Sequence, residues 1–249
     1  MNIFLAIGTI GCFFTTYAWE LTDMLPASLF PRHESTASHE FIKVTEPLSF
    51  TVTQQQGIVK VKGWDKESVS IKIIQKGTAE GLENTVVSIN KDKLPRELSC
   101  TVSRKDEEKS LAQVTIQAYV PFNCDLTVQS QKGFIKTKNL SRAQSLYTDE
   151  GNVEIVLNKF SVESSLFVHS KKGSITIEAP KKIQAQLSTS TLRGTITSEL
   201  FITLQPQTTL LDKDYWQRVK KEVNGFLGDG GAPITLEAEY GDIKIVAKK

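Results

Sequence analysis

The clearest pattern along this chain is a short motif in which a glycine precedes alternating polar and apolar residues. At 173–177, Gly173 is followed by Ser174, Ile175, Thr176 and Ile177, so apolar side chains fall two and four positions after the glycine. Two more apolar positions lie seven and five residues before it. This period of two is typical of a β-strand with one buried face. The motif occurs six times, with its glycine at Gly57, Gly133, Gly151, Gly173, Gly194 and Gly241.

The six copies define 24 inward positions, of which 20 are apolar. Thr137, Thr189 and Ser198 are small residues that suit a strand, and Gln144 is the one clear departure. A unit of this size cannot bury an apolar face alone, so we predict that neighbouring units stack and share one core. The fold is therefore expected to be all-β, either a β-solenoid resembling a right-handed β-helix or an elongated β-sandwich. The six glycines are expected to be structural turn residues, with the polar positions beside them facing solvent.

Alternation outside the copies predicts further strands. It begins at Phe41 and continues through 48–52, 69–73 and 86–89, with room for a turn of helix at 80–83. Two longer strands are expected at 98–102 and 114–120. The mixed charges of 104–109 are typical of an exposed loop, so we predict that these two strands form an antiparallel hairpin.

Residues 210–224 interrupt the period. Tyr215, Val219 and Val223 are spaced by four, which predicts a short helix near 212–224. A strand from about 217 to 227 is the alternative.

The first 18 residues differ in character from the rest of the chain. Residues 3–14 are an apolar run shorter than the roughly 20 residues that cross a membrane, and the small residue Ala18 follows. We expect a signal peptide or N-terminal anchor at 1–18, with a hydrophobic first strand as the alternative because the first basic residue is Arg32. Cys12 would be the site of lipidation, but Thr9 stands where lipoprotein signals carry an aliphatic residue. A linker at 19–40 and a folded domain at 41–249 are expected to follow.

Composition and motifs limit the classes of function and of binding site that the chain can have. A net charge of +2 over 249 residues argues against a dedicated nucleic-acid binder, which would show a basic stripe. The glycine-rich stretch at 225–231 lacks the Lys-Ser/Thr ending of a phosphate loop, so we expect it to supply positive φ at a tight corner. No Gly-x-Ser-x-Gly, Cys-x-x-Cys or His-Glu-x-x-His motif occurs. Neither Asp212 with Asp214 nor Asp229 with Asp242 belongs to a full series of calcium ligands, so no metal and no cofactor is expected.

The cysteines left after removal of an export segment are Cys100 and Cys124. In an exported chain they could form one disulfide, and the alternative is that Cys100 is a small buried apolar group on a strand. His33 and His39 lie in the expected linker and His169 in a distant copy of the motif, so all three are expected to be surface residues.

Three segments resemble the bacterial putative-adhesin family of β-strand repeats, which is largely a domain of unknown function. They are 57–69, 119–126 running into Gly133, and 225–236 with 241–245. The resemblance covers roughly residues 41–249. It implies stacked β-strands in an exported or membrane-anchored protein, and it assigns no catalytic residues.

We therefore expect a non-catalytic, extracytoplasmic protein of the periplasm or cell surface that serves as an adhesion or envelope-associated binding or structural module. Its partner would be a glycan or an envelope protein, with membrane association through the N-terminal segment. One alternative is a glycan-active β-solenoid enzyme, which needs charged side chains stacked about 5 Å apart on adjacent strands. Another is an accessory protein of envelope-stress signalling.

Overall fold

The structure is a computed structural model that describes residues 34–45, 47–205 and 221–248. The expected export segment, most of the expected linker, Asp212 and Asp214 lie outside these ranges. The described residues form one sheet of 17 strands with a single short helix, α2 (Ala79–Asn84), so the prediction of an all-β fold is confirmed. Among these residues, no helix is long and apolar enough to cross a membrane.

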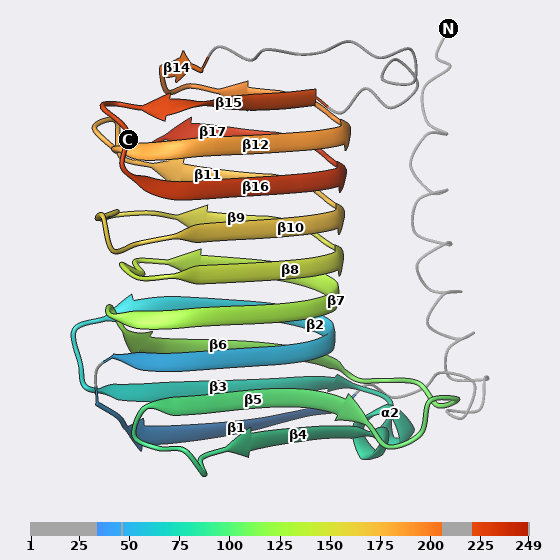
Figure 1. Cartoon of the computed structure of the whole chain (residues 1–249). Helices are drawn as coiled ribbons and strands as arrows, with labels where there is room; N and C mark the ends of the chain where they lie inside the picture. Colours follow the sequence, from blue (N-terminus) through green and yellow to red (C-terminus); the bar gives the residue numbers. More distant parts are fainter. Residues whose placement is uncertain (1–33, 46, 206–220, 249) are drawn as a thin grey trace, which may run out of the picture. The chain divides into compact units, whose positions relative to one another are not determined.

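Figure 1 shows the strands lying one above another in layers. In chain order they are β1 (Glu34–Lys43), β2 (Leu48–Trp64), β3 (Ser68–Gly77), β4 (Thr85–Asn90), β5 (Glu97–Arg104), β6 (Gln113–Pro121), β7 (Cys124–Lys138), β8 (Gln144–Glu150), β9 (Val153–Val156), β10 (Leu166–Lys172), β11 (Ile175–Ala179), β12 (Ala185–Arg193), β13 (Ile196–Ser198), β14 (Ile202–Leu204), β15 (Lys221–Leu227), β16 (Ala232–Tyr240) and β17 (Ile243–Ala247).

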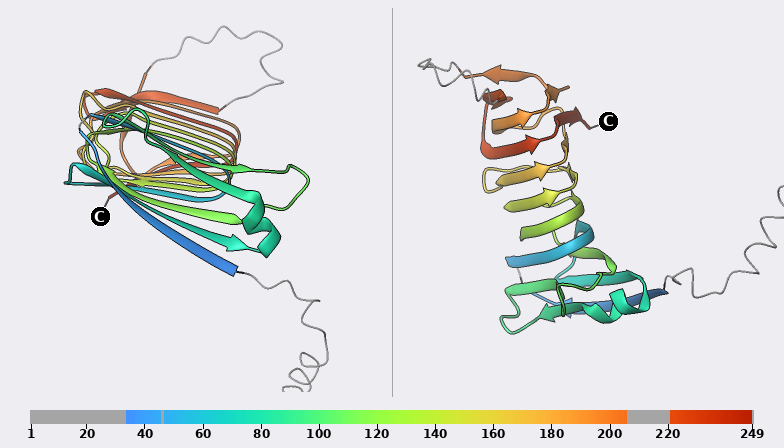
Figure 2. Two further views of the ribbon diagram at one scale, coloured as in Figure 1. Left: turned by 90° about the horizontal axis from the view of Figure 1, so that it is seen from below. Right: turned by 90° about the vertical axis from the view of Figure 1, so that its right-hand side faces the viewer.

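The six copies of the glycine motif occupy six adjacent layers. Before the glycines, the strands pair in parallel in the order β2, β7, β8, β10, β16, β12. After the glycines, the order is β2, β7, β9, β11, β17, β13. Every pairing keeps the motif in register, so that Gly57 lies opposite Gly133 and Phe50 opposite Leu126. Viewed from below, successive layers superpose on one another (Figure 2).

The last copy of the motif in the sequence is not the last layer in space. β16 lies between β10 and β12, and β17 lies between β11 and β13. Figure 1 shows this as red β16 beneath orange β12. The chain therefore passes over one layer position after Ala179, and its C-terminal strands fill that position.

The inward positions of the motif form the part of the core that the six layers share, and buried residues of β3, β5 and β6 extend it. All 24 are buried except Ile196 and Ser198, which belong to the layer at one end of the stack. Two of the polar departures satisfy each other, because the hydroxyl of Thr137 donates to Gln144 Oε1 at 2.8 Å inside the core. Thr189 donates to the carbonyl of Val223 at 3.1 Å.

The glycines form a column in which each layer touches the next. A Cβ placed on Gly133, Gly151 or Gly173 would lie 1.7, 1.5 and 2.0 Å from the carbonyl oxygen of the glycine in the neighbouring layer. Four of the six, Gly57, Gly133, Gly151 and Gly173, also have φ between +137° and +149°. Both the close approach and the backbone conformation require glycine.

The expected hairpin of 98–102 with 114–120 is wrong. Both segments are strands, β5 and β6, but they do not pair with each other. β5 runs parallel to the first part of β2, with Ser49 opposite Glu97, and β6 runs parallel to its second part, with Gly57 opposite Val114. The reason is the length of β2, which at 17 residues offers one edge long enough for two strands in succession. β4 then covers β5, while β3 and β1 extend the sheet beyond β6.

The described residues bear on three further expectations. Residues 221–227 form β15, antiparallel to β12 and β14, so the helix expected near 212–224 is wrong for residues 221–224. Residues 212–220 lie outside the described ranges. β1 begins at Glu34, so the sheet starts within the stretch expected as linker. The glycine-rich stretch after β15 has positive φ at Gly228, Gly230 and Gly231, as predicted.

The disulfide considered for Cys100 and Cys124 does not form, because the register separates the two cysteines. Cys100 lies opposite Val52 on one side of β2, and Cys124 lies opposite Leu48 on the other side. Four residues along a strand amount to about 13 Å, whereas disulfide-bonded Cα atoms are within about 7 Å. Both side chains are buried, and burial raises the pKa of the Cys100 thiol to about 12. The Cys124 thiol donates to the Asp125 carbonyl at 3.5 Å.

Candidate functional site

A polar groove of about 480 Å³ crosses the strands on the side of the sheet that precedes the glycine column. Side chains of β2, β5, β7, β8 and β10 line it. The lining residues are Thr53, Gln54, Gln55, Thr101, Val102, Ser103, Gln129, Ser130, Gln131, Tyr147, Thr148, Asp149 and His169.

The groove is built around one row of outward side chains. Thr101, Thr53, Gln129, Tyr147 and His169 are register neighbours on five adjacent strands. Because adjacent strands are about 4.8 Å apart, the row offers a hydroxyl, amide, phenol or imidazole at that interval. In the motif copies this position lies four residues before the glycine, so the repeat itself creates the row.

Beneath this row, two buried polar atoms have no protein partner. Gln54 and Thr148 are 1% and 3% exposed, and neither Gln54 Oε1 nor Thr148 Oγ1 has a hydrogen-bond partner among the described residues. The Gln54 amide nitrogen donates to Ser130 Oγ at 3.3 Å. Buried polar groups usually have partners, so hydrogen-bonding capacity is left over directly below the groove.

One aromatic surface interrupts the polar row. Tyr147 is 39% exposed, and its ring centroid lies 5.3 Å from that of Phe167 on the next strand. The contact holds the phenol ring in place while leaving its exposed part to solvent. An amphipathic ring among amides and hydroxyls can pack against the apolar side of a ligand whose polar groups bond to its neighbours.

A histidine and two carboxylates lie together at the β10 end of the groove. His169 lies between two carboxylates of β16, with Nδ1 3.3 Å from Glu237 Oε2 and Nε2 3.9 Å from Glu239 Oε1. These three side chains are 33–41% exposed, so water reaches all of them. Within the groove itself Asp149 is the one carboxylate among the lining residues.

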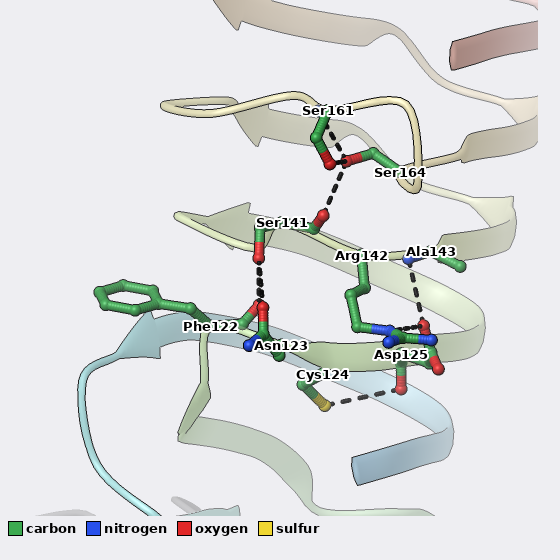
Figure 3. A network of polar contacts seen from close by, with 9 residues as sticks. All are labelled: Phe122, Asn123, Cys124, Asp125, Ser141, Arg142, Ala143, Ser161 and Ser164. Carbon is green, nitrogen blue, oxygen red and sulfur yellow. Dashed lines mark hydrogen bonds and ion pairs between the residues drawn. The ribbon is translucent and has the colours of Figure 1, made fainter. Parts of the chain in front are cut away.

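A second polar cluster lies at the turns that join the layers (Figure 3). Ser141 Oγ donates to the Phe122 carbonyl at 2.9 Å, and Ser164 Oγ donates to the Ser141 carbonyl at 2.7 Å. Asp125 Oδ1 accepts from Arg142 Nε at 3.0 Å, and this bond raises the pKa of the Arg142 guanidinium. These bonds connect one turn to the next, so the cluster serves to hold the layers together.

A third set of polar contacts lies beside the glycine column. Asn152 Oδ1 accepts from the Ser174 amide at 2.8 Å, Ser174 Oγ accepts from the Asp242 amide at 3.4 Å, and Asp242 Oδ1 accepts from the Thr195 amide at 2.8 Å. In these four layers the polar residue after the glycine therefore bonds to a neighbouring layer, which gives these positions a structural role.

The candidate residues considered from the sequence do not converge on a metal or catalytic centre. Asp242 is engaged with Thr195, whereas Asp229 accepts a bond from Gln184 at 3.5 Å elsewhere in the fold. His39 contacts Ser70 at 2.7 Å, far in sequence from His169. Among the described residues, no group of three or more His, Cys, Asp or Glu side chains is arranged to hold a metal ion.

Sequence reasoning missed the groove residues themselves. Gln129, Tyr147 and His169 share one position of the repeat, and that shared position is the signal that could have grouped them. The wall formed by Thr101 and Ser103 depends on the placement of β5 along β2, which no local pattern reveals.

No protein-family model and no curated protein matches this chain. Its fold is similar to the crystal structure of a putative cell adhesion protein from Clostridium sporogenes, with a TM-score of 0.66, 10% identity, and coverage of 86% of this chain and 100% of that one. A putative adhesin from Bacteroides fragilis gives a TM-score of 0.29 at 12% identity, over 85% of this chain and 97% of that one. The likeness to the first structure concerns the fold, and it agrees with the resemblance to the putative-adhesin family.

Proposed function

We propose that this chain is a non-catalytic binding module outside the cytoplasm that holds a linear, neutral glycan in the groove along Gln129, Tyr147 and His169. The observation that carries the proposal is the register-matched row of hydrogen-bonding side chains, one from each strand. We also propose that the stacked layers form a β-solenoid. The in-register parallel pairing of six successive layers supports this architecture, as does the glycine column.

A glycan fits the chemistry of this groove better than other ligand classes. Amide and hydroxyl groups both donate and accept hydrogen bonds, as sugar hydroxyls do. The Tyr147 ring offers an apolar surface for one sugar ring, a combination typical of ligand sites with a few orienting polar groups.

The shape of the row suits a polymer. Beyond His169 the same position continues through Glu237 on β16. Six adjacent strands at about 4.8 Å each extend the row over about 24 Å. An extended chain of several sugar units could therefore contact successive layers, and such repeated contacts are the basis of an adhesive role.

Binding to soluble oligosaccharides from a glycan array, followed by titration calorimetry, tests the proposal. We expect Gln129→Ala and Tyr147→Ala each to weaken binding about tenfold, since each removes roughly one good contact. Gln186→Ala and Tyr240→Ala are matched controls, because both are exposed residues outside the groove lining. Equal losses in the control variants, or an array with no bound glycan, would contradict the proposal and leave an envelope protein as the partner.

The glycan-active enzyme remains the second candidate because His169 lies between Glu237 and Glu239. A general acid at such a site needs a pKa raised by an apolar, water-poor setting, and the partial exposure of these side chains favours binding instead. Mass spectrometry of a bound oligosaccharide after prolonged incubation separates the two candidates. We expect intact oligosaccharide, and shortened products that disappear in Glu237→Gln or Glu239→Gln would establish the enzyme.

The proposed location outside the cytoplasm rests on the apolar segment at 3–14. Cell fractionation followed by sequencing of the mature N-terminus tests it. We expect a new N-terminus near Ala18 or a membrane-bound intact chain, and an intact Met1 in the cytosol would refute this part of the proposal.

A further inference from the structure

A sheet face on the other side of the glycine column carries seven lysines and no carboxylate of its own. It consists of the outward positions of β1, β3, β6, β2 and β7, which are register neighbours in that order. None of these positions holds an Asp or Glu. We call this surface the lysine face, and its lysines are Lys43, Lys60, Lys62, Lys72, Lys76, Lys136 and Lys138.

The charges of the lysine face are largely unmatched. Among the described residues, only Lys136 of these seven has a carboxylate partner, Glu154 on β9, at 2.8 Å. Lys60 lies directly opposite Lys136, and Lys62 lies directly opposite Lys138. Like charges directly opposite each other on neighbouring strands are destabilising. Since the whole chain has a net charge of only +2, this segregation is local, and an anionic partner would relieve it.

Three aromatic rings border the lysine face at one end. The Trp64 ring centroid lies 6.2 Å from that of Phe41 and 5.4 Å from that of Tyr119. Phe41 is 62% exposed and Tyr119 is 41% exposed. The ammonium groups of Lys66 and Lys62 lie 4.8 Å and 5.6 Å from the Trp64 and Tyr119 ring centroids. Mixed lysine and aromatic side chains are typical of protein surfaces at the level of lipid headgroups.

We propose that the lysine face docks on an anionic lipid bilayer, with the three rings among the headgroups. The lysines spread in two dimensions over β1, β3, β2 and β7, a span of about 19 Å across the strands, which matches a surface better than a single row would match a polymer chain. A hollow of about 230 Å³ lined by Lys60, Lys62, Lys136 and Lys138 could receive an anionic headgroup.

This inference goes beyond the proposed glycan groove and does not depend on it. The groove lies on strand segments before the glycines, and the β2 and β7 part of the lysine face lies after them, so both surfaces can be occupied at once. It also differs from attachment through the N-terminal segment, because it assigns membrane contact to the folded sheet.

Co-sedimentation of the full-length protein with vesicles tests the proposal. Vesicles of phosphatidylcholine alone measure any contribution of the N-terminal segment, and vesicles with about one third phosphatidylglycerol add the surface charge that attracts lysines. We expect binding to the anionic vesicles to be stronger and to weaken as salt shortens the range of electrostatic attraction. Each lysine near such a surface contributes about fivefold in affinity, so Lys60→Glu/Lys138→Glu should lose at least about 25-fold. The matched control Lys171→Glu/Lys182→Glu alters two exposed lysines off this face and should stay close to wild type.

Fluorescence locates the contact independently of affinity. In a Trp19→Phe/Trp216→Phe background, Trp64 is the remaining tryptophan. We expect its emission to shift to the blue and to be quenched by lipids brominated in the acyl chain, but only with anionic vesicles. Equal binding of both vesicle types, full retention of binding by Lys60→Glu/Lys138→Glu, or an unchanged Trp64 signal would overturn the proposal. Tight binding of soluble polyphosphate without vesicle binding would assign the face to a soluble polyanion instead. Circular dichroism of each variant confirms that the fold is kept.

Discussion

At the scale of single residues, each corner glycine is fixed by the layer beside it. Gly151 has a φ of +149°, and a Cβ there would lie 1.5 Å from the carbonyl oxygen of Gly133. The carbonyl cannot yield easily, because Gly133 lies within β7, which pairs with β8 and β9 on either side of Gly151. The requirement for glycine in one layer therefore follows from the close approach of the next layer.

Gly151→Ala should destabilise the protein by about 3 kcal/mol or more, because the substitution combines a backbone clash with an unfavourable φ. Urea unfolding followed by circular dichroism measures the loss. Gly81→Ala is the control, since Gly81 lies in α2 with its nearest neighbouring atom 3.3 Å from the added Cβ, and alanine favours a helix by about 1 kcal/mol. A Gly151→Ala midpoint close to that of the wild type would show that the layers can move apart at no cost.

The Thr137–Gln144 pair is a polar contact that replaces two apolar positions of the motif. Thr137→Val removes the donor to Gln144 Oε1, and leaving a buried acceptor unpaired costs about 1–3 kcal/mol. Thr137→Val/Gln144→Leu restores apolar residues at both positions and should recover most of that loss. A double-mutant cycle of unfolding free energies measures the coupling, which we expect to be about 1 kcal/mol or more. Additive single losses would mean that the two side chains do not depend on each other.

At the scale of elements, polar ladders link one strand to the next at the corners. Asp242 Oδ1 accepts from the amide and the hydroxyl of Thr195, both at 2.8 Å. The bond from the Thr195 amide, followed by that from its hydroxyl, lowers the pKa of the Asp242 carboxyl. At the same position of the repeat, Asn152 accepts from the Ser174 amide without a charge.

This difference predicts an acid-sensitive contact at Asp242. A carboxyl whose pKa is lower in the folded state contributes stability above its unfolded pKa of about 3.9, and this contribution is lost as the pH falls through the folded pKa. Asp242→Asn keeps an acceptor, as Asn152 does, and should reduce the loss of stability on acidification from about pH 6 to about pH 3. Urea midpoints across this range test the prediction. The same acid dependence in Asp242→Asn and wild type would show that other carboxylates dominate.

The elements were predictable from the sequence to the extent that they are local. Period-two alternation identified β2, β3, β4, β5 and β6, because it depends only on which side chains face the core. Partner choice is not local, so the pairing of β5 with β6 was wrong. The long edge of β2 accepts both strands in succession, and nothing within 98–120 encodes that.

The candidate site likewise combines residues that a local pattern predicts with residues that only non-local pairing brings together. The row of Gln129, Tyr147 and His169 lies at a fixed position of the motif and could have been assembled from the sequence alone. The wall formed by β5 and the charged cluster of His169 with Glu237 could not, because both join segments that are distant in the chain. The spacing of Tyr215, Val219 and Val223 suggested a helix, but Val223 lies in β15, where antiparallel pairing with β12 determines the local structure.

At the scale of the whole molecule, the layers are not stacked in the order in which they occur along the chain. The C-terminal layer, β16 with β17, pairs on both sides: with β10 and β11 on one, and with β12 and β13 on the other. Its strands bury Ile234, Leu236 and Ile243 within the common core. β16 and β17 thus fill an inner position of the stack, and the layer of β12 with β13, which precedes them in the chain, lies farther out.

A truncation after Gly231 should therefore disrupt more than its own layer. It would leave β10 with β11, and β12 with β13, facing a missing neighbour, with long unpaired strand edges that promote aggregation. We expect the truncated chain to lose its cooperative unfolding transition and to become sensitive to trypsin from β10 to β15. If the repeats stacked in chain order instead, the same truncation would remove only an end layer, and a repeat stack tolerates that with a modest loss of stability. A truncated protein with a urea midpoint near that of the wild type would thus contradict the inserted position of the last layer.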